Sequence, residues 1–267
     1  MGCLKLQYYS AQIPFYPWNP EPVKERAENV VQMWLSVDPM AEKHPEMSPY
    51  NYCSLNPVIR FDPNGKTDYV LLPNGTIERY GPENNEPDRL GTRAQDGKIH
   101  YITVSDKSLL RDLAVNRAKI ITEDANGTVI SETIMRYASS KSKSDVVKVF
   151  SFVGKYSKVE WTVYSSNNNS GYYIGSYGLD DLSPSSEDYG LNEVNVQTMV
   201  HNHLKKSSES EEIASLYGDK SVAMGVKYNY YTYYPHSKNL YKIDNKSGEI
   251  ACTKNAGIEK LSNALGK

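Results

Sequence analysis

The sequence predicts an α+β fold in which a sheet is flanked by helices. Alternating apolar and polar residues, typical of strands, recur through the second half of the chain. Two segments, one near Leu109 and one after Asp145, instead carry apolar residues at helical spacing. Turn dipeptides such as Asn126-Gly127 separate these segments, as expected where short strands and helices follow one another.

Composition narrows the classes of protein. The chain has 267 residues, 39% hydrophobic and 23% charged, which is long enough for two small globular domains. A formal net charge of -2 argues against a nucleic-acid partner, and no apolar run approaches the length of a membrane span. The first residues lack the apolar core of a secretory signal, so the compartment stays unknown and export is expected only by another route or as part of a larger protein.

Cysteine and tyrosine are the two residue types whose numbers are informative. The 3 cysteines are scattered and odd in number, which predicts neither a disulfide framework nor a cysteine-type zinc site. Tyrosine is unusually frequent, with 22 residues against 4 phenylalanines, and tyrosine-rich strands are expected to form extended, partly polar surfaces.

The first half of the chain is predicted to be rich in turns and strands. Residues 1–66 are interpreted as irregular strands and turns with one short helix at 22–31. Residues 67–138 are interpreted as a β-rich connecting region with one helix. Its expected elements are a hairpin at 69–80, a polar loop at 81–97, a strand at 100–104, a helix at 109–118 capped by Ser105 or Asp106, and a strand at 129–137.

Residues 139–267 are predicted to be a separate α+β domain, reached through a Ser/Lys-rich linker at 139–144. Asp145 is expected to cap its first helix. The expected elements are a helix at 146–155, strands at 159–165, 171–177 and 194–201, a helix at 220–224 beginning after Asp219, strands at 226–234, 240–244 and 249–253, and a helix at 257–265.

The most informative motif is His201-Asn202-His203, at the end of an alternating strand-like run. Residues two apart on a strand point to the same side, so both imidazoles are expected to face one point. With Asp219 as a carboxylate, they make the three-ligand set of a catalytic zinc site with one open position. Glu160 is the candidate general base, although an edge-strand glutamate facing water is the alternative interpretation.

Glu160, His201-Asn202-His203 and Ser215 followed by Asp219 occur in the order of the JAMM signature, and residues 130–253 resemble the JAB/MPN metallopeptidase superfamily. The resemblance implies a mixed sheet flanked by helices and a Zn²⁺ ion. It further implies that His201, His203 and Asp219 are ligands, that Glu160 is the general acid/base, and that Ser215 stabilises the oxyanion.

The chain departs from the pattern of this superfamily in three places. Leu204 replaces the usual proline, residues 205–214 form an insert, and Ser215 lies four rather than three residues before Asp219. Other residues compete for the assigned roles: Ser210 for the serine, and Asp180, Asp181 and Glu193 for the acids.

A second resemblance covers residues 33–66. Four spaced words, at 34–43, 48–53, 56–58 and 62–65, resemble the RHS repeat-associated core domain. The resemblance implies that residues 1–66 are an RHS-core-like segment and that a variable effector or toxin domain follows. Asp38 and Asp62 correspond to the self-cleavage carboxylates of that family, but cleavage is not expected here because the upstream repeats are missing.

Together, these patterns predict a bacterial RHS-associated effector or toxin with a zinc-dependent peptidase or isopeptidase domain, acting on a protein or peptide. Such a layout also implies an immunity protein as a partner. Two alternatives stay open: a non-enzymatic RHS remnant acting as a surface or interaction module, and a nuclease toxin. The letters His-Asn-His resemble HNH nucleases, but those enzymes spread the three residues over a ββα element.

Overall fold

The structure is a computed structural model that describes residues 69–80, 85–94, 97–124, 126–167 and 171–266. The helix predicted at 22–31, the RHS-like segment at 33–66, Asp38 and Asp62 lie outside these residues. The chain divides into two compact units, of which the second comprises residues 71–79 and 86–267 and contains the sites discussed below.

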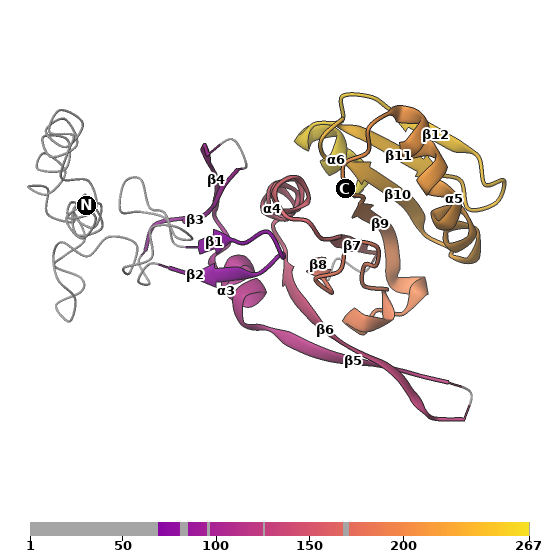
Figure 1. Cartoon of the computed structure of the whole chain (residues 1–267), viewed down its shortest axis with the longest axis horizontal. Helices are drawn as coiled ribbons and strands as arrows, with labels where there is room; N and C mark the ends of the chain where they lie inside the picture. The colour runs from indigo at the N-terminus through magenta and orange to yellow at the C-terminus, as the bar shows by residue number, and fades with distance from the viewer. Residues whose placement is uncertain (1–68, 81–84, 95–96, 125, 168–170, 267) are drawn as a thin grey trace, which may run out of the picture. The chain divides into compact units, whose positions relative to one another are not determined.

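The described residues form an α+β fold, which confirms the predicted class (Figure 1). In chain order the elements are β1 (Tyr69–Leu71), β2 (Ile77–Arg79), β3 (Asp88–Arg93), β4 (Ile99–Val104), α3 (Lys107–Val115), β5 (Arg117–Glu123), β6 (Val129–Ser140), α4 (Lys143–Tyr156), β7 (Thr162–Ser166), β8 (Tyr172–Ser176), β9 (Val196–Asn202), α5 (Glu209–Gly225), β10 (Asn229–Tyr234), β11 (Asn239–Ile243), β12 (Ile250–Thr253) and α6 (Ile258–Ala264). They make a four-stranded sheet, β2-β1-β3-β4, and an eight-stranded sheet, β12-β11-β10-β9-β7-β8-β6-β5.

The centre of the large sheet is a crossover. Strands β9 and β10 pair in parallel, whereas β9 pairs with β7, and β10 with β11, in antiparallel orientation. Neighbouring parallel strands need a long connection, which α5 supplies here. The connection therefore places α5 over one face of the sheet, the face on which the side chains of Thr232 and Tyr234 of β10 lie.

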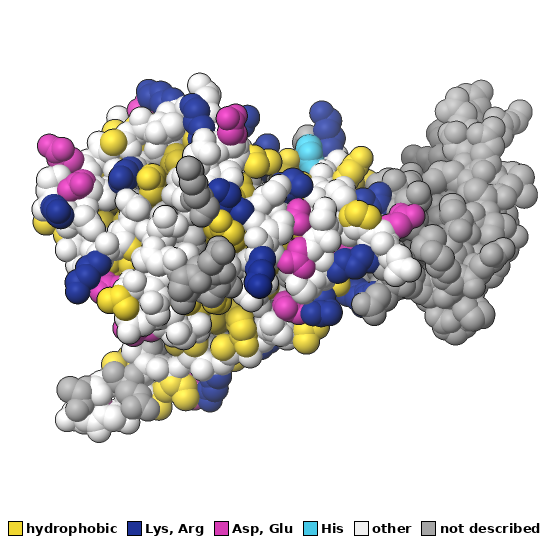
Figure 2. All heavy atoms as spheres, turned by 180° about the vertical axis from the view of Figure 1, so that it is seen from behind, with side chains coloured by type: hydrophobic (Ala, Val, Ile, Leu, Met, Phe, Trp, Pro, Cys, Tyr) yellow, Lys and Arg dark blue, Asp and Glu magenta, His cyan; other side chains and the backbone are white. Residues whose placement is uncertain are grey.

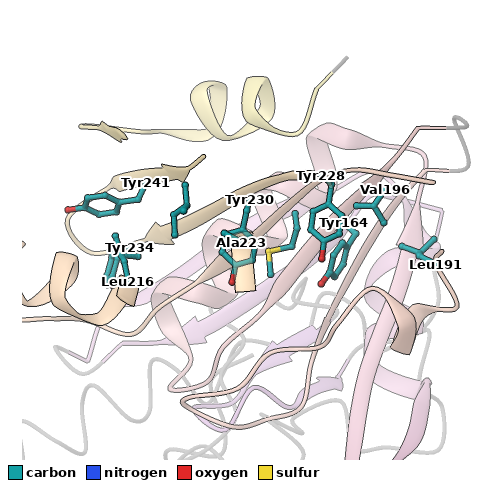
Figure 3. Close-up of a cluster of buried hydrophobic side chains, with 11 residues drawn as sticks. Tyr164, Leu191, Val196, Leu216, Ala223, Tyr228, Tyr230, Tyr234 and Tyr241 are labelled. Carbon is teal, nitrogen blue, oxygen red and sulfur yellow. The ribbon is translucent and has the colours of Figure 1, made fainter. Parts of the chain in front are cut away.

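Tyrosine fills the core between α5 and the sheet. Tyr230 and Tyr234 of β10 lie beside Ala223 and Leu216 of α5 (Figure 3). The buried cluster also includes Tyr164, Tyr228 and Tyr241. Buried tyrosine adds apolar area while its hydroxyl keeps a polar partner. The tyrosine-rich strands thus build a core, and the expectation that they form exposed surfaces was wrong for these residues.

The opposite face of the sheet packs against α4. Tyr233 alternates with Tyr234 along β10, and its ring lies 6.1 Å from that of Phe150. The helix begins earlier than predicted, because Ser142 is its N-cap. Asp145 is buried and accepts hydrogen bonds from the backbone N–H groups of Ser105 and Asp106, at 3.1 and 2.9 Å. Asp145 therefore ties α4 to the start of α3 and is not the cap.

The region between residues 81 and 140 differs most from the prediction. The expected loop at 81–97 contains β3, which pairs along its length with β4 and buries Leu90. Helix α3 is capped by Asp106, and the guanidinium of Arg117 binds the carbonyls of Leu113 and Ala114 at its end. Charged residues dominate β3, so the alternation that identifies a strand is absent.

Strand β5, which the sequence did not predict, follows α3 and pairs with β6. Strand β6 runs into the predicted linker, since Ser139 and Ser140 pair with Tyr173 and Tyr172 of β8, and α4 already begins at Lys143. The predicted boundary at 138–139 therefore falls inside a strand of the large sheet. The division of the chain into three domains stays a prediction.

Helix α5 is much longer than the predicted helix at 220–224. Its N-cap Ser208 accepts a hydrogen bond from the Glu211 N–H at 3.3 Å, so the insert at 205–214 builds the first turns of the helix. The side chains that α5 turns inward include Glu212, Leu216, Asp219 and Ala223. Several other apolar side chains lie on its outer face, where Ile213, Tyr217, Val222 and Met224 are 41% to 71% exposed. Since acids occupy part of the inner stripe, the usual helical periodicity is hidden.

The cap gives a direct test of where α5 begins. Ser208→Ala removes the acceptor for the Glu211 N–H, so the free energy of unfolding should fall by about 1 kcal/mol in urea denaturation. Ser210→Ala is the matched control, because Ser210 lies in the first turn, exposed, and is expected to change stability little. Equal losses in the two variants would contradict a helix start at Glu209.

Candidate metal centre

Four segments of the second unit meet at one place on the large sheet. They are the residues just before β7, the end of β9, the middle of α5 and β10. The register explains the meeting, because His201 pairs with Thr162 of β7 on one side and with Thr232 of β10 on the other. Paired residues of adjacent strands share a face of the sheet, so these three side chains point toward α5.

The two histidines face a common carboxylate. Nε2 of His201 and Nε2 of His203 each lie 3.3 Å from Oδ2 of Asp219, and the ring centroids are 4.8 Å apart. His201 is the last but one residue of β9, and His203 follows the strand, with its N–H bound to the carbonyl of Tyr233 at 3.0 Å. The alternation of side chains thus brings both imidazoles to one point.

These distances fit a tetrahedral zinc ion. Nitrogen and oxygen ligands lie about 2.0–2.1 Å from zinc, which separates two ligand atoms of a tetrahedron by about 3.3 Å. The same 3.3 Å is long for a hydrogen bond between nitrogen and oxygen. Two imidazoles and one carboxylate also match the donor set of known catalytic zinc sites. The residues present therefore fit the metal that the sequence predicted.

Glu160 is the second carboxylate of the centre. Its Oε1 lies 3.7 Å from Nε2 of His203, and the ligand atoms of Glu160, His201 and His203 all lie within 4.8 Å of one another. The sequence predicted a strand at 159–165 that contains Glu160, but β7 begins only at Thr162, so Glu160 precedes the strand. It is buried, so the alternative of an edge-strand glutamate facing water was wrong.

The backbone holds Glu160 in place and its surroundings change its acidity. The Glu160 N–H donates to the carbonyl of Leu179 at 2.7 Å, and its carbonyl accepts from Ser176 at 2.5 Å. Burial raises the pKa of Glu160 to about 7; the charge of His203 opposes this rise, and Asp219 adds to it. A carboxyl group with such a pKa both takes up and releases a proton near neutral pH.

Asp219 is placed by the sheet below it. The hydroxyl of Thr232 donates to Oδ2 at 2.7 Å, and burial would raise the pKa of Asp219. The adjacent His201 and His203 outweigh burial and hold the pKa well below its ordinary value. Asp219 is therefore an ionised acceptor between two imidazoles.

Asn202, the middle letter of the motif, points elsewhere. Its Oδ1 accepts the N–H of Trp161 at 2.8 Å, and its own N–H donates to the Trp161 carbonyl at 3.1 Å. These bonds fasten the end of β9 to the start of β7 and so set the position of Glu160. The three side chains of His201-Asn202-His203 do not converge, unlike those of an HNH nuclease site.

Ser215 lies one helical turn before Asp219, on the same face of α5. Its Oγ is 3.4 Å from Nδ1 of His203, in close contact with the hydroxyl of Tyr234, and donates to the carbonyl of Glu212 at 2.8 Å. The serine thus reaches the side of His203 that faces away from Asp219. Its competitor Ser210 is exposed in the first turn of α5.

The competing acids lie outside the centre. Asp181 adds to the raised pKa of Glu160, Asp180 lines a separate pocket with Pro73 and Asn74, and Glu193 sits in a short 3₁₀ turn. The grouping of close ligand atoms among the described residues contains none of the three.

Sequence reasoning missed the residues that support the ligands. Thr232 and Tyr234 of β10 contact Asp219 and His203, and buried Glu212 accepts hydrogen bonds from Asn239 at 2.8 Å and Tyr241 at 2.9 Å. Because Thr232 and Tyr234 are two residues apart on one strand, the sequence could have shown that their side chains share a face. Placing that face beside the histidines requires the parallel pairing of β9 with β10, which the sequence does not indicate.

A pocket of about 200 Å³ opens beside His203. Its walls include Lys205, Lys206, Pro235 and His236. The pKa of His236 is lowered by burial and by Lys205 and Lys155, so positive charge gathers on this side of the centre.

Comparison with known proteins points to one family. No curated protein and no solved structure matches the chain. No helix among the described residues has the length and apolarity to cross a membrane. A family model matches residues 138–224, from the end of β6 through nearly all of α5, and this stretch contains Glu160, His201, His203, Ser215 and Asp219. The family is described as JAB-like toxin 1, so the match supports a toxin-type effector and the JAB-like half of the resemblance.

Proposed function

We propose that the C-terminal part of this chain is a zinc-dependent peptidase or isopeptidase domain of a toxin-type effector. His201, His203 and Asp219 hold the metal. The observation that carries the proposal is the position of Asp219 Oδ2, 3.3 Å from Nε2 of both histidines, beside the buried carboxyl of Glu160. The match to the JAB-like toxins over the same residues supports it.

A zinc ion with three protein ligands supplies an acidified water and polarises a carbonyl group, the two requirements of amide hydrolysis. Glu160 takes up the proton of the attacking water at its carboxylate and passes it to the leaving nitrogen. Its pKa of about 7 suits both steps, because the protonated and the ionised carboxyl are both populated near neutral pH. The hydrogen bond from Thr232 keeps Asp219 oriented throughout.

The substrate in this proposal is a protein or peptide. The pocket beside His203 gives room for a substrate side chain. On the face that Figure 2 shows, basic and acidic side chains of the described residues are interspersed. An RHS-core-like origin of residues 33–66 and an immunity protein as partner complete the proposal, in line with a toxin-type effector.

Metal analysis of the full chain tests the proposal. The protein should contain one equivalent of zinc, which His201→Ala should lose and a chelator should remove. His236→Ala is the matched control, since His236 lines the adjacent pocket without facing Asp219, and it should keep the metal. A metal-free protein that is equally stable with and without chelator would favour the non-enzymatic interaction module. Metal-dependent cleavage of DNA or RNA would favour the nuclease alternative.

A further inference from the structure

We infer that Tyr234 and Ser215 form a relay of two hydroxyl groups that fixes His203 with its proton on Nδ1. The relay leaves Nε2 of His203 free to bind the metal, so Ser215 is a positioning residue and not a donor to the oxyanion. This inference rests on the proposed metal centre and names the residues that hold one of its ligands.

The relay is a continuous series of short contacts. Nδ1 of His203 lies 2.9 Å from the hydroxyl of Tyr234, which is in close contact with Oγ of Ser215. Oγ of Ser215 lies 2.8 Å from the carbonyl oxygen of Glu212 on the preceding turn of α5. The direct distance from Ser215 to Nδ1 is 3.4 Å, too long for a strong hydrogen bond, so Tyr234 is the immediate partner.

Counting protons assigns the tautomer. Three contacts in series, His203 to Tyr234, Tyr234 to Ser215 and Ser215 to the Glu212 carbonyl, need three protons. The two hydroxyl groups supply two, and the carbonyl oxygen supplies none. The third proton must come from Nδ1, which donates to Tyr234 while Tyr234 donates to Ser215 and Ser215 donates to the carbonyl. The Tyr234 hydroxyl also lies 3.0 Å from the Glu212 carbonyl, so four contacts join these groups. A proton on Nδ1 gives three of the four contacts a hydrogen bond, whereas a proton on Nε2 alone gives two.

The relay is anchored at its far end and is specific to one histidine. The carboxylate of Glu212 is held by Asn239 and Tyr241, which fixes the turn whose carbonyl ends the relay. By contrast, Nδ1 of His201 is buried and has no hydrogen-bond partner among the described residues. Partners of this kind on ligand histidines typically set metal affinity by 10- to 100-fold. His203 is therefore the oriented ligand of the pair.

The position of Ser215 separates this role from the one that the resemblance implied. The two ring nitrogens of an imidazole point away from each other, so a group bound at Nδ1 lies behind the ring, away from a metal at Nε2. A donor to the oxyanion would have to lie on the side of Asp219 and Glu160. Ser215 acts on the reaction through His203.

The experiment measures zinc affinity by chelator competition on the full chain. Tyr234→Phe keeps the ring but removes the acceptor of the Nδ1 proton, and should weaken zinc binding by about 10- to 100-fold. Ser215→Ala should weaken it by a smaller factor, since the Tyr234 hydroxyl then donates to the Glu212 carbonyl 3.0 Å away. Tyr164→Phe is the matched control, because it removes a buried tyrosine hydroxyl that donates to the carbonyl of Pro184 and takes no part in the relay, and zinc affinity should stay unchanged.

Long-range ¹H–¹⁵N NMR on the histidine rings gives a readout that does not depend on the metal. The metal-free protein should have His203 protonated on Nδ1, and Tyr234→Phe should shift the population toward Nε2. Unchanged zinc affinity in both Tyr234→Phe and Ser215→Ala would overturn the inference. So would a Ser215→Ala variant that lost activity about a hundredfold at full zinc affinity, as expected of an oxyanion donor. A wild-type protein without zinc affinity would refute the proposed function instead, and the tautomer would still decide the relay.

Discussion

Glu160→Gln is expected to keep its zinc and to lose peptide hydrolysis by about 10²- to 10⁴-fold. Glutamine preserves the shape and the backbone contacts of Glu160 to Leu179 and Ser176. It cannot take up a proton, which is the role that we propose for this buried carboxyl, whose pKa is raised to about 7. Two quantities are measured in the same samples. Mass spectrometry follows the cleavage of a defined peptide pool, and metal analysis gives the zinc content.

Glu193→Gln is the control for this variant, because Glu193 lies in a 3₁₀ turn outside the centre and should leave both readings unchanged. The prediction fails in two distinguishable ways. Full activity in Glu160→Gln would remove Glu160 from the chemistry. Loss of zinc would instead indicate that Glu160 is a metal ligand. This outcome is a genuine alternative, because the ligand atoms of Glu160 lie close to those of His201 and His203.

Asp219→Asn is expected to lower zinc affinity by about a thousandfold. Binding of zinc to full protein sites is worth about 10–16 kcal/mol, so the loss of one charged ligand among three costs several kcal/mol. Asparagine keeps the volume and an acceptor for Thr232, which separates loss of the ligand from loss of the fold. Isothermal titration or competition with a chromophoric chelator measures the change.

Thermal stability reports the same event independently. Zinc at a hundredfold excess over its dissociation constant should stabilise the wild-type protein by about 2.7 kcal/mol, and Asp219→Asn should abolish most of that gain. Asp180→Asn in the neighbouring loop is the control and should respond to zinc like the wild type. Zinc affinity that survives Asp219→Asn but not Glu160→Gln would exchange the roles of the two carboxylates.

Local patterns in the sequence were sufficient for part of the fold. The strands corresponding to β9, β10, β11 and β12 and the helix α4 were predicted close to their observed positions. Helix α4 and strand β9 carry a regular apolar period, whereas β10 is mostly tyrosine and β12 has no such period. The convergence of His201 and His203 followed from the same alternation. Strand β3 and strand β5 were missed, because their stability comes from pairing with β4 and β6 and not from their own composition.

The supporting residues of the centre depend on contacts that are distant in sequence. Antiparallel register sets Glu160 opposite the end of β9, and the parallel pairing of β9 with β10 brings Thr232 and Tyr234 to the histidines. Only the end of α5 was predicted, although Ser208 and Glu211 form a recognisable start, because the inward residues of its first turns include acids.

The inverted side chains of α5 have a consequence for how the helix stays docked. Its inward stripe holds to the sheet through Glu212 and Asp219, which bind Asn239, Tyr241 and Thr232, and only partly through Leu216 and Ala223. Hydrogen bonds depend on the distance and angle between donor and acceptor, whereas burial of apolar area is non-directional. An ion bound by Asp219 would add a further link between α5 and the strands beneath it, so metal binding would raise the stability of the docked helix.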